Sequence, residues 1–287
     1  MRLRSVRLPS ATLVIGAAVS VQGGAAVAKS LFPTLGPPGV VFLRLGFGAL
    51  ALWVIGKPQL RERPRRELAL VGLLGVTLVC MNLAFYESLE RLPLGVAVTV
   101  EFTGPLTVAV LASRRPLDFV WIALAAVGIV LLANGGGKAV HPLGLVLATT
   151  AGFFWGCYIV LGTKVGRAFA GTTGLAPAMA IGAVIALPWG VISAGHNLGN
   201  AQLVGAGVGV GLLCSALPWS LELEAMRRMP TTVFGVLMSL EPAVAALSGF
   251  VFLHEHLQVR AWVALALVVV ASAGASLRRG PELPPDA

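Results

Sequence analysis

The sequence predicts an all-α membrane protein with ten transmembrane helices, arranged as two inverted five-helix repeats. Hydrophobic residues make up 57% of the chain and charged residues 11%, whereas about 25% of residues are charged in an average soluble domain. Apolar spans follow one another between Ser10 and Leu277, and most approach the ~20 residues that a helix needs to cross ~30 Å of hydrocarbon. The second five spans also resemble the first five.

Two patterns carry this internal repeat. The segment 121–127 (WIALAAV) recurs as 262–268 (WVALALV), and the spacing between Pro93 and Pro105 recurs between Pro230 and Pro242. An odd number of spans per repeat makes the second copy enter the membrane from the opposite side. Inverted repeats are typical of secondary transporters, whose substrate site lies between the halves near the midplane.

We therefore expect a single membrane domain over residues 1–287, with repeat one at about 10–134 and repeat two at about 142–277. The tail 280–287 is expected to be disordered. The predicted spans are 10–31, 38–56, 68–88, 94–113, 119–134, 142–162, 174–193, 202–226, 231–252 and 260–277.

Prolines mark both the starts and the interiors of these spans. Pro38 and Pro142 lie at or near helix starts, where a missing N–H costs little. Pro105, Pro218 and Pro242 lie inside spans, so we expect them to kink the helices or to free backbone carbonyls.

The net charge of +9 is unevenly distributed along the chain. With a cytoplasmic N-terminus, sixteen of the 21 Lys and Arg residues lie on the cytoplasmic side, whereas only Arg91, Lys138 and Arg260 lie outside. This split follows the positive-inside rule, so we expect both termini in the cytoplasm and no nucleic-acid partner. Residues 1–28 also resemble a cleavable signal peptide, but the repeat needs the first span as the counterpart of the sixth.

Several segments resemble a known family. The segment 94–115 is similar to the fourth span of bacterial EamA-type carriers of the drug/metabolite transporter superfamily. The segments 22–33, 114–121, 216–222 and 238–243 resemble one branch of it, the inner-membrane threonine and homoserine exporters. The resemblance runs from about Gln22 to Leu277, and His254 departs from it because many relatives have glycine there. It implies a 5+5 helix fold and export of small metabolites, driven by an ion gradient without a cofactor.

Two carboxylates at membrane depth are the leading candidates for substrate or proton binding. Glu241 lies ~15 Å into the ninth span and Glu101 ~10 Å into the fourth, at 1.5 Å per residue. The repeat alignment puts Glu101 within one turn of the position related to Glu241, so both are expected to face one central cavity. A structural ion pair or a buried protonated acid is the alternative for each. A charged group at this depth costs ~2.5–3.5 kcal/mol on insertion scales.

Basic residues at depth would complement these acids in binding an amino acid. Arg44 is expected to pair with Glu101 or to hold a substrate carboxylate, and Lys29 to extend to the membrane interface or to line the site. Glu222 is expected either to bridge to Arg227 at a helix end or to contact substrate.

The remaining candidates are polar or aromatic side chains that could line the cavity or bond neighbouring helices. They are Gln22, Asn82, Tyr86, Trp155, Tyr158, Ser220 and Ser239. The three cysteines fall inside apolar spans and are interpreted as packing residues. Gly135–Lys138 lacks the spacing of a phosphate-binding loop, and His254–Glu255–His256 lacks that of a zinc site. We therefore expect neither an enzyme nor a metal protein.

The resulting hypothesis is proton-coupled export of threonine- or homoserine-like amino acids from the bacterial inner membrane. Two alternatives stay open. A different metabolite or a drug-like amine would be favoured by a cavity with more aromatic than polar groups. A scaffold without transport activity would pair off all of its intramembrane acids. The sequence does not predict the oligomeric state.

Overall fold

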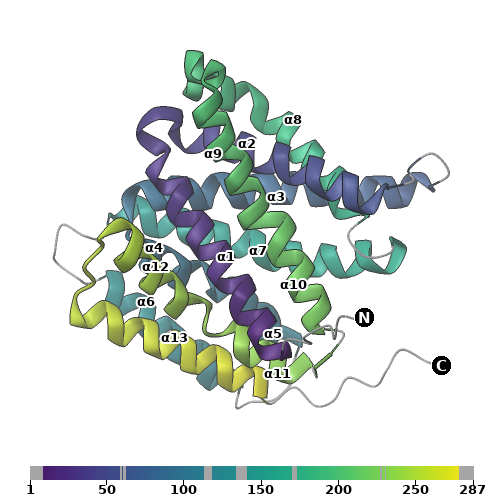
Figure 1. The fold of residues 1–287 in the computed structure, drawn as a ribbon. Helices are drawn as coiled ribbons and strands as arrows, with labels where there is room; N and C mark the ends of the chain where they lie inside the picture. Colours follow the sequence, from purple (N-terminus) through teal and green to yellow (C-terminus); the bar gives the residue numbers. More distant parts are fainter. Residues whose placement is uncertain are drawn as a thin grey trace, which may run out of the picture.

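The computed structural model describes residues 9–58, 60, 63–112, 118–133, 141–169, 173–226, 228–229 and 231–277. Every regular element within these residues is helical (Figure 1). The helices are α1 (Ser10–Ser30), α2 (Phe32–Gly56), α3 (Arg65–Arg91), α4 (Leu94–Glu101), α5 (Thr103–Ala112), α6 (Asp118–Ala133), α7 (Pro142–Ala168), α8 (Leu175–Ala194), η1 (Gly195–Gly199), α9 (Ala201–Gly211), η2 (Leu212–Ala216), α10 (Leu217–Met226), α11 (Thr231–Met238), α12 (Glu241–Leu253) and α13 (Val259–Leu277).

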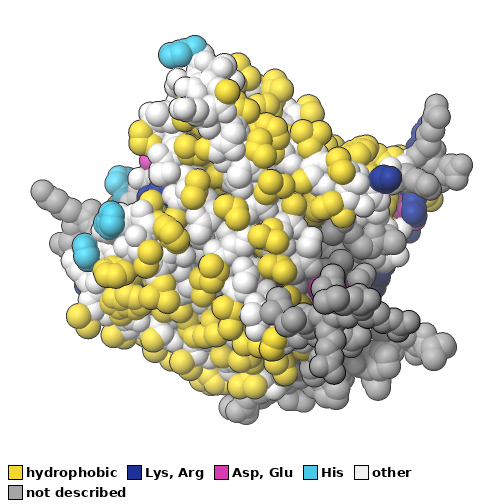
Figure 2. Space-filling model, viewed as in Figure 1, with side chains coloured by type: hydrophobic (Ala, Val, Ile, Leu, Met, Phe, Trp, Pro, Cys, Tyr) yellow, Lys and Arg dark blue, Asp and Glu magenta, His cyan; other side chains and the backbone are white. Residues whose placement is uncertain are grey.

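The described helices are long and apolar enough for a membrane protein. Eight helical segments have the length and hydropathy to cross a membrane, and two shorter apolar segments cover Leu94–Val108 and Phe119–Leu132. Figure 2 shows hydrophobic side chains spread over the visible face of the molecule. Large apolar side chains such as Val54, Phe153 and Ile192 are exposed to well over half of their area. A bilayer is the solvent that such a surface requires. The expectation of an all-α membrane protein is confirmed.

Some predicted boundaries were too short. Within α2 the helix is interrupted at Gly36, where φ is 66°, so the regular helix that starts with Pro37 and Pro38 begins close to the predicted residue 38, and a short helical segment from Phe32 precedes it. Helices α3 and α7 run beyond the predicted spans 68–88 and 142–162. At the end of α3, Arg91 forms an ion pair with Glu87 one turn earlier, so the helix continues past the apolar run.

Three prolines inside apolar spans coincide with irregular helix. The fourth span divides at Phe102, three residues before Pro105. The ninth span divides at Ser239–Leu240, and the first of these two residues lies three residues before Pro242. In the eighth span the π-helical segment η2 precedes Pro218. A proline lacks the N–H that would bond to the carbonyl four residues earlier, so the helix loses its regular hydrogen bond there.

The helices pack in a recurring set of pairs. Helix α2 lies against α8, α3 against α7, α4 against α12, α6 against α13, and α1 against α10. Figure 1 shows α6 and α13 side by side along one edge of the bundle. The crossing of α4 and α12 needs glycine, because a Cβ at Gly95 would lie 2.7 Å from the Cα of Ala246.

Candidate functional site

Acidic and amide side chains lie in the interior of the bundle. Glu241 is 6% exposed, Glu101 is 7% exposed and Gln22 is 3% exposed. They come from different helices: Gln22 from the middle of α1, Glu101 from the last residue of α4, and Glu241 from the first residue of α12. Both acids therefore lie beside the breaks that divide the fourth and ninth spans.

Gln22 and Glu241 are in direct contact. The Nε2 of Gln22 donates a hydrogen bond to the Oε1 of Glu241 at 3.0 Å, joining residues 219 positions apart in the chain. The amide oxygen of Gln22 (Oε1) and the second carboxyl oxygen of Glu241 (Oε2) are buried and have no partner among the described residues. A buried acceptor without a donor costs ~1–3 kcal/mol, so this pair stands out from a fully bonded structural contact.

Arg44 is anchored by an aromatic ring and a backbone carbonyl. Its Nη1 donates to the Oη of Tyr86 at 3.0 Å, and its Nη2 donates to the carbonyl oxygen of Cys214 at 3.3 Å. That carbonyl is four residues before Pro218, which has no N–H to bond it. The Nε of Arg44 is buried with no partner among the described residues.

The expected pairing of Arg44 with Glu101 is corrected by this geometry. Within the described chain, Arg44 and Glu101 form no ion pair; Tyr86 and Cys214 take up the ends of the guanidinium instead. Glu101 nevertheless lies within electrostatic range of Arg44 and Glu241. The two acids and the arginine thus share one electrostatic neighbourhood.

Glu222 extends this neighbourhood along α10. It lies within electrostatic range of Glu241 and of the hydroxyl of Tyr158 on α7. The ring of Tyr158 meets that of Trp219 edge-on, with 5.5 Å between centroids. Arg227, the partner expected for Glu222, lies outside the described residues.

Lys29 belongs to a different cluster. Its Nζ lies 2.7 Å from the Oε1 of Glu255 and donates to the carbonyl oxygen of Leu92 at 2.6 Å. The Oε2 of Glu255 accepts the backbone N–H of Leu94 at the start of α4. The expectation that Lys29 extends freely to the interface is therefore wrong: the ion pair ties the end of α1 to the loop after α12 and the link between α3 and α4.

Other predicted residues make local contacts. Asn82 and Ser220 each donate to the carbonyl one turn earlier in their own helices. Ser239 bonds the carbonyl of Gly235 and the hydroxyl of Ser272 on α13. The ring of Trp155 meets Phe102 at the α4–α5 break, with 5.3 Å between centroids. These contacts join or bend helices and leave the Gln22–Glu241 pair and Arg44 as the centre of the site.

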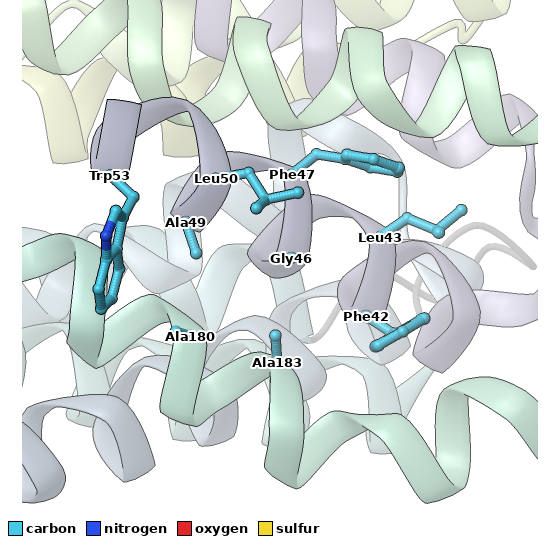
Figure 3. Close-up of a pocket in the computed structure, with 9 residues that line it drawn as sticks. All are labelled: Phe42, Leu43, Gly46, Phe47, Ala49, Leu50, Trp53, Ala180 and Ala183. Carbon is cyan, nitrogen blue, oxygen red and sulfur yellow. The ribbon is translucent and has the colours of Figure 1, made fainter. Parts of the chain in front are cut away.

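An apolar cavity of about 350 Å³ lies elsewhere, between α2 and α8 (Figure 3). None of the predicted site residues lines it, and its wall includes Trp53 and Leu50, both on the exposed face of α2. The full lining is Phe42, Leu43, Gly46, Phe47, Ala49, Leu50, Trp53, Ala180 and Ala183. Its lining has no charged side chain, so we do not assign it to a hydrophilic substrate.

Sequence reasoning missed three contributors. Cys214 is more than a packing residue, because its carbonyl holds Arg44 and its thiol contacts the carbonyl of Val21. Ser20 donates to the carbonyl of Leu213 in η2. Glu255 was considered only as part of a metal motif, yet it binds Lys29. Within the residues described, no group of three His, Cys, Asp or Glu side chains is placed to hold a metal ion.

Comparison with known proteins gives consistent relatives. The chain is 44% identical over 280 residues to the threonine/homoserine exporter RhtA of Escherichia coli K12, covering 96% of this chain and 94% of that protein. It is equally identical, over 283 residues, to the RhtA of Salmonella typhimurium LT2. The uncharacterized inner membrane transporter YedA of Escherichia coli K12 is 26% identical over 84% of this chain and 80% of that protein.

A fold comparison and a family model complete these findings. A solved crystal structure superposes with a TM-score of 0.65 at 19% identity, covering 93% of this chain and 96% of that one. The model of the EamA-like transporter family matches twice, at residues 8–134 and 142–277. The chain is a transporter rather than an enzyme, and it belongs to the EamA-like transporter family.

Proposed function

We propose that this protein exports small hydrophilic amino acids, foremost threonine and homoserine, across the bacterial inner membrane. The carrying observation is the 44% identity to a threonine/homoserine exporter over almost the whole length of both chains. The geometry of the interior supports it. An amino acid has one carboxylate and one ammonium, and the interior holds a basic and an acidic group with unpaired polar atoms, Arg44 and Glu241.

The proposed architecture is ten transmembrane helices in two inverted repeats. The double match of the family model, at 8–134 and 142–277, supports it. The helix pairs support it as well. The pairs α2–α8, α4–α12 and α6–α13 each join a span of the first half to the equivalent span of the second half. The pair of α1 with α10, the first and eighth spans, is equivalent to the pair of α7 with α3, the sixth and third spans. The breaks at Phe102 and at Ser239–Leu240 lie in corresponding positions as well. A two-fold relation between the halves accounts for all three observations.

We further propose that both termini are cytoplasmic. The distribution of Lys and Arg supports this orientation. The start of α1 and the end of α13 also both lie beside α11, because Leu13 clusters with Phe234 and a Cβ at Gly235 would lie 3.0 Å from Ser276. Two ends on the same side require an even number of crossings.

Protons are the proposed coupling ion, and Glu241 is the proposed site of exchange. Its Oε2 is buried and finds no partner in the described part of the chain, whereas Gln22 bonds its other oxygen. An unpaired carboxylate oxygen inside a membrane protein is costly when charged and has to gain either a proton or a cation. If proton and substrate occupy Glu241 in turn, inward movement of one is tied to outward movement of the other.

Arg44 is the proposed partner of the substrate carboxylate. Its Nε has no partner among the described residues, and the Tyr86 and Cys214 contacts hold the guanidinium in place. Glu101 is the second proposed coupling acid, since it lies within electrostatic range of both Arg44 and Glu241. Glu222, Tyr158, Tyr86 and Trp155 are proposed as the surrounding wall.

A second candidate is export of an aromatic or apolar amine. One observation favours it: the cavity between α2 and α8 is lined by Phe42, Phe47 and Trp53 without a polar side chain. A scaffold without transport activity is less consistent with the interior, because it would leave no acid with an unpaired oxygen, and Glu241 has one.

A growth assay tests the proposed substrates. Cells that overproduce the protein should tolerate higher external homoserine or threonine and hold smaller intracellular pools of both. Immunodetection in the membrane fraction shows that the protein is inserted. Unchanged tolerance and unchanged pools in such cells would reject threonine and homoserine, and a gain in tolerance only to aromatic amines would favour the second candidate.

A further inference from the structure

We infer that Gln22 and Glu241 together form the subsite for the substrate's ammonium group, and that Gln22 makes the exporter selective for ammonium groups with at least two N–H donors. The inference rests on the proposed function, which it deepens by naming the atoms that bind the amino group. The observation that carries it is the pair of buried, unpartnered oxygens described above: Oε1 of Gln22 and Oε2 of Glu241.

The hydrogen bond between the two residues fixes the direction of the amide. A carboxylate offers only acceptors to a neighbour, so Gln22 presents its Nε2 to the Oε1 of Glu241 at 3.0 Å. The amide oxygen therefore points away from that contact, where it is an acceptor without a donor. Each side chain is thus held by the other with one oxygen left to bind a ligand.

The helices around the pair leave it little freedom to find another partner. Gly24 brings α1 against η2 so closely that a Cβ there would lie 2.5 Å from the Sγ of Cys214. Ser20 bonds the carbonyl of Leu213 on the same side of α1. Glu241 begins α12 directly after the α11–α12 break, with Pro242 next to it. The two unpaired oxygens are consequently presented by backbone that is fixed on both sides.

An ammonium group with at least two N–H donors is what such a pair of acceptors selects. A primary ammonium carries a positive charge and three N–H donors, as the ammonium of a lysine does, so it can bond both oxygens and still donate once more. A hydroxyl has one donor and cannot satisfy both. One methyl group on the amine leaves the two donors that the pair needs, a second leaves only one, and a quaternary ammonium has none.

Selectivity follows from the cost of leaving either oxygen unbonded. A site built to hydrogen-bond a donor rejects an analogue that lacks it, because its own buried acceptor then stays unpaired. Gln22 adds an acceptor without adding charge. Its removal should therefore weaken binding of an amine with two or three N–H donors more than that of a tertiary amine, whereas loss of simple charge attraction would weaken both alike.

The test uses the full-length protein in proteoliposomes, loaded with radiolabelled threonine, and measures exchange against external threonine, N-methylthreonine and N,N-dimethylthreonine. For wild type we expect N-methylthreonine to bind about as well as threonine and N,N-dimethylthreonine about tenfold more weakly, a step that corresponds to one lost hydrogen bond. In Gln22→Met, which keeps an unbranched chain of similar length, the affinity for threonine should fall about tenfold and the preference over N,N-dimethylthreonine should largely disappear. Gln202→Met, an exposed glutamine on α9, should behave as wild type.

A second measurement separates this inference from the proposed function. Methylammonium, dimethylammonium and tetramethylammonium chloride are compared as additives in thermal unfolding of the detergent-purified protein. Stabilisation of wild type by methylammonium and dimethylammonium but not by tetramethylammonium, lost in Gln22→Met, supports the subsite even if threonine is not exchanged. Threonine exchange in which wild type accepts N,N-dimethylthreonine as well as threonine, or in which Gln22→Met keeps the wild-type preference, overturns it. The wild-type arm decides the question even if Gln22→Met fails to fold.

Discussion

At the scale of single residues, the account depends on which polar atoms lack a partner. Asn82, Ser220 and Ser239 all find acceptors nearby. Glu241 does not: Gln22 bonds one of its oxygens and the other has no described partner. Since buried polar groups are normally bonded, this exception identifies the residue on which proton and substrate are proposed to alternate.

Replacing Glu241 by glutamine tests that role. Glu241→Gln keeps the volume and an acceptor oxygen but cannot change its charge, so it should abolish threonine efflux driven by an imposed pH gradient while leaving part of the threonine exchange. Both activities are measured in the same proteoliposomes. Glu224→Gln is the matched control, because Glu224 forms a partly exposed ion pair with Arg228 on the helix end, where such a pair contributes ~0–1 kcal/mol. A Glu241→Gln protein that pumps as fast as wild type would move the proton site to Glu101.

At the scale of helices, the breaks in the fourth and ninth spans set the position of both acids. Glu101 ends α4, and Gly152 on α7 packs against it: a Cβ at Gly152 would lie 2.6 Å from the carbonyl oxygen of Glu101. Gly104, just after the break, has a virtual Cβ only 1.8 Å from the carbonyl oxygen of Gly152. Glycine on both sides is therefore what allows α7 to approach the broken helix.

A methyl group at Gly152 should displace this break. We expect Gly152→Ala to lower the free energy of unfolding by ~1–3 kcal/mol, as overpacking typically does, and to slow threonine exchange because Glu101 moves. Thermal unfolding and exchange rates measure the two effects. Gly166→Ala on the same helix meets nothing within 4 Å and should be neutral or slightly stabilising. Equal behaviour of the two variants would show that the close approach at Gly152 does not matter.

The sequence predicts helices better than it predicts contacts between them. Apolar runs of the right length locate the spans, and the depth of Glu101 and Glu241 follows from counting residues along them. No pattern in the sequence predicts the π-helical turn η2 in the same way. Pro218 alone does not predict that the Cys214 carbonyl will accept a hydrogen bond from Arg44. The Lys29–Glu255 and Gln22–Glu241 pairs join segments more than two hundred residues apart, and hydrophobic patterning carries no information about such pairs.

At the scale of the whole molecule, the proposed inverted repeat determines the topology. Two five-span halves of opposite orientation return the chain to the side on which it started. A reporter fused after Gly280 should therefore be active as a cytoplasmic reporter, such as green fluorescent protein, and inactive as a periplasmic one, such as alkaline phosphatase. A fusion after Lys138, between the halves, should behave in the opposite way. Periplasmic activity of the fusion after Gly280 would contradict both the orientation and the even number of spans.

Counterflow in proteoliposomes tests the central claim most directly, because it requires only a site that faces each side in turn. Purified protein is reconstituted with internal unlabelled threonine, and uptake of external radiolabelled threonine, homoserine and a panel of other amino acids and aromatic amines is followed. Threonine and homoserine should accumulate transiently above equilibrium, and the aromatic amines should not. Uptake of threonine and homoserine no faster than in protein-free liposomes, by protein shown to be folded, would contradict the account.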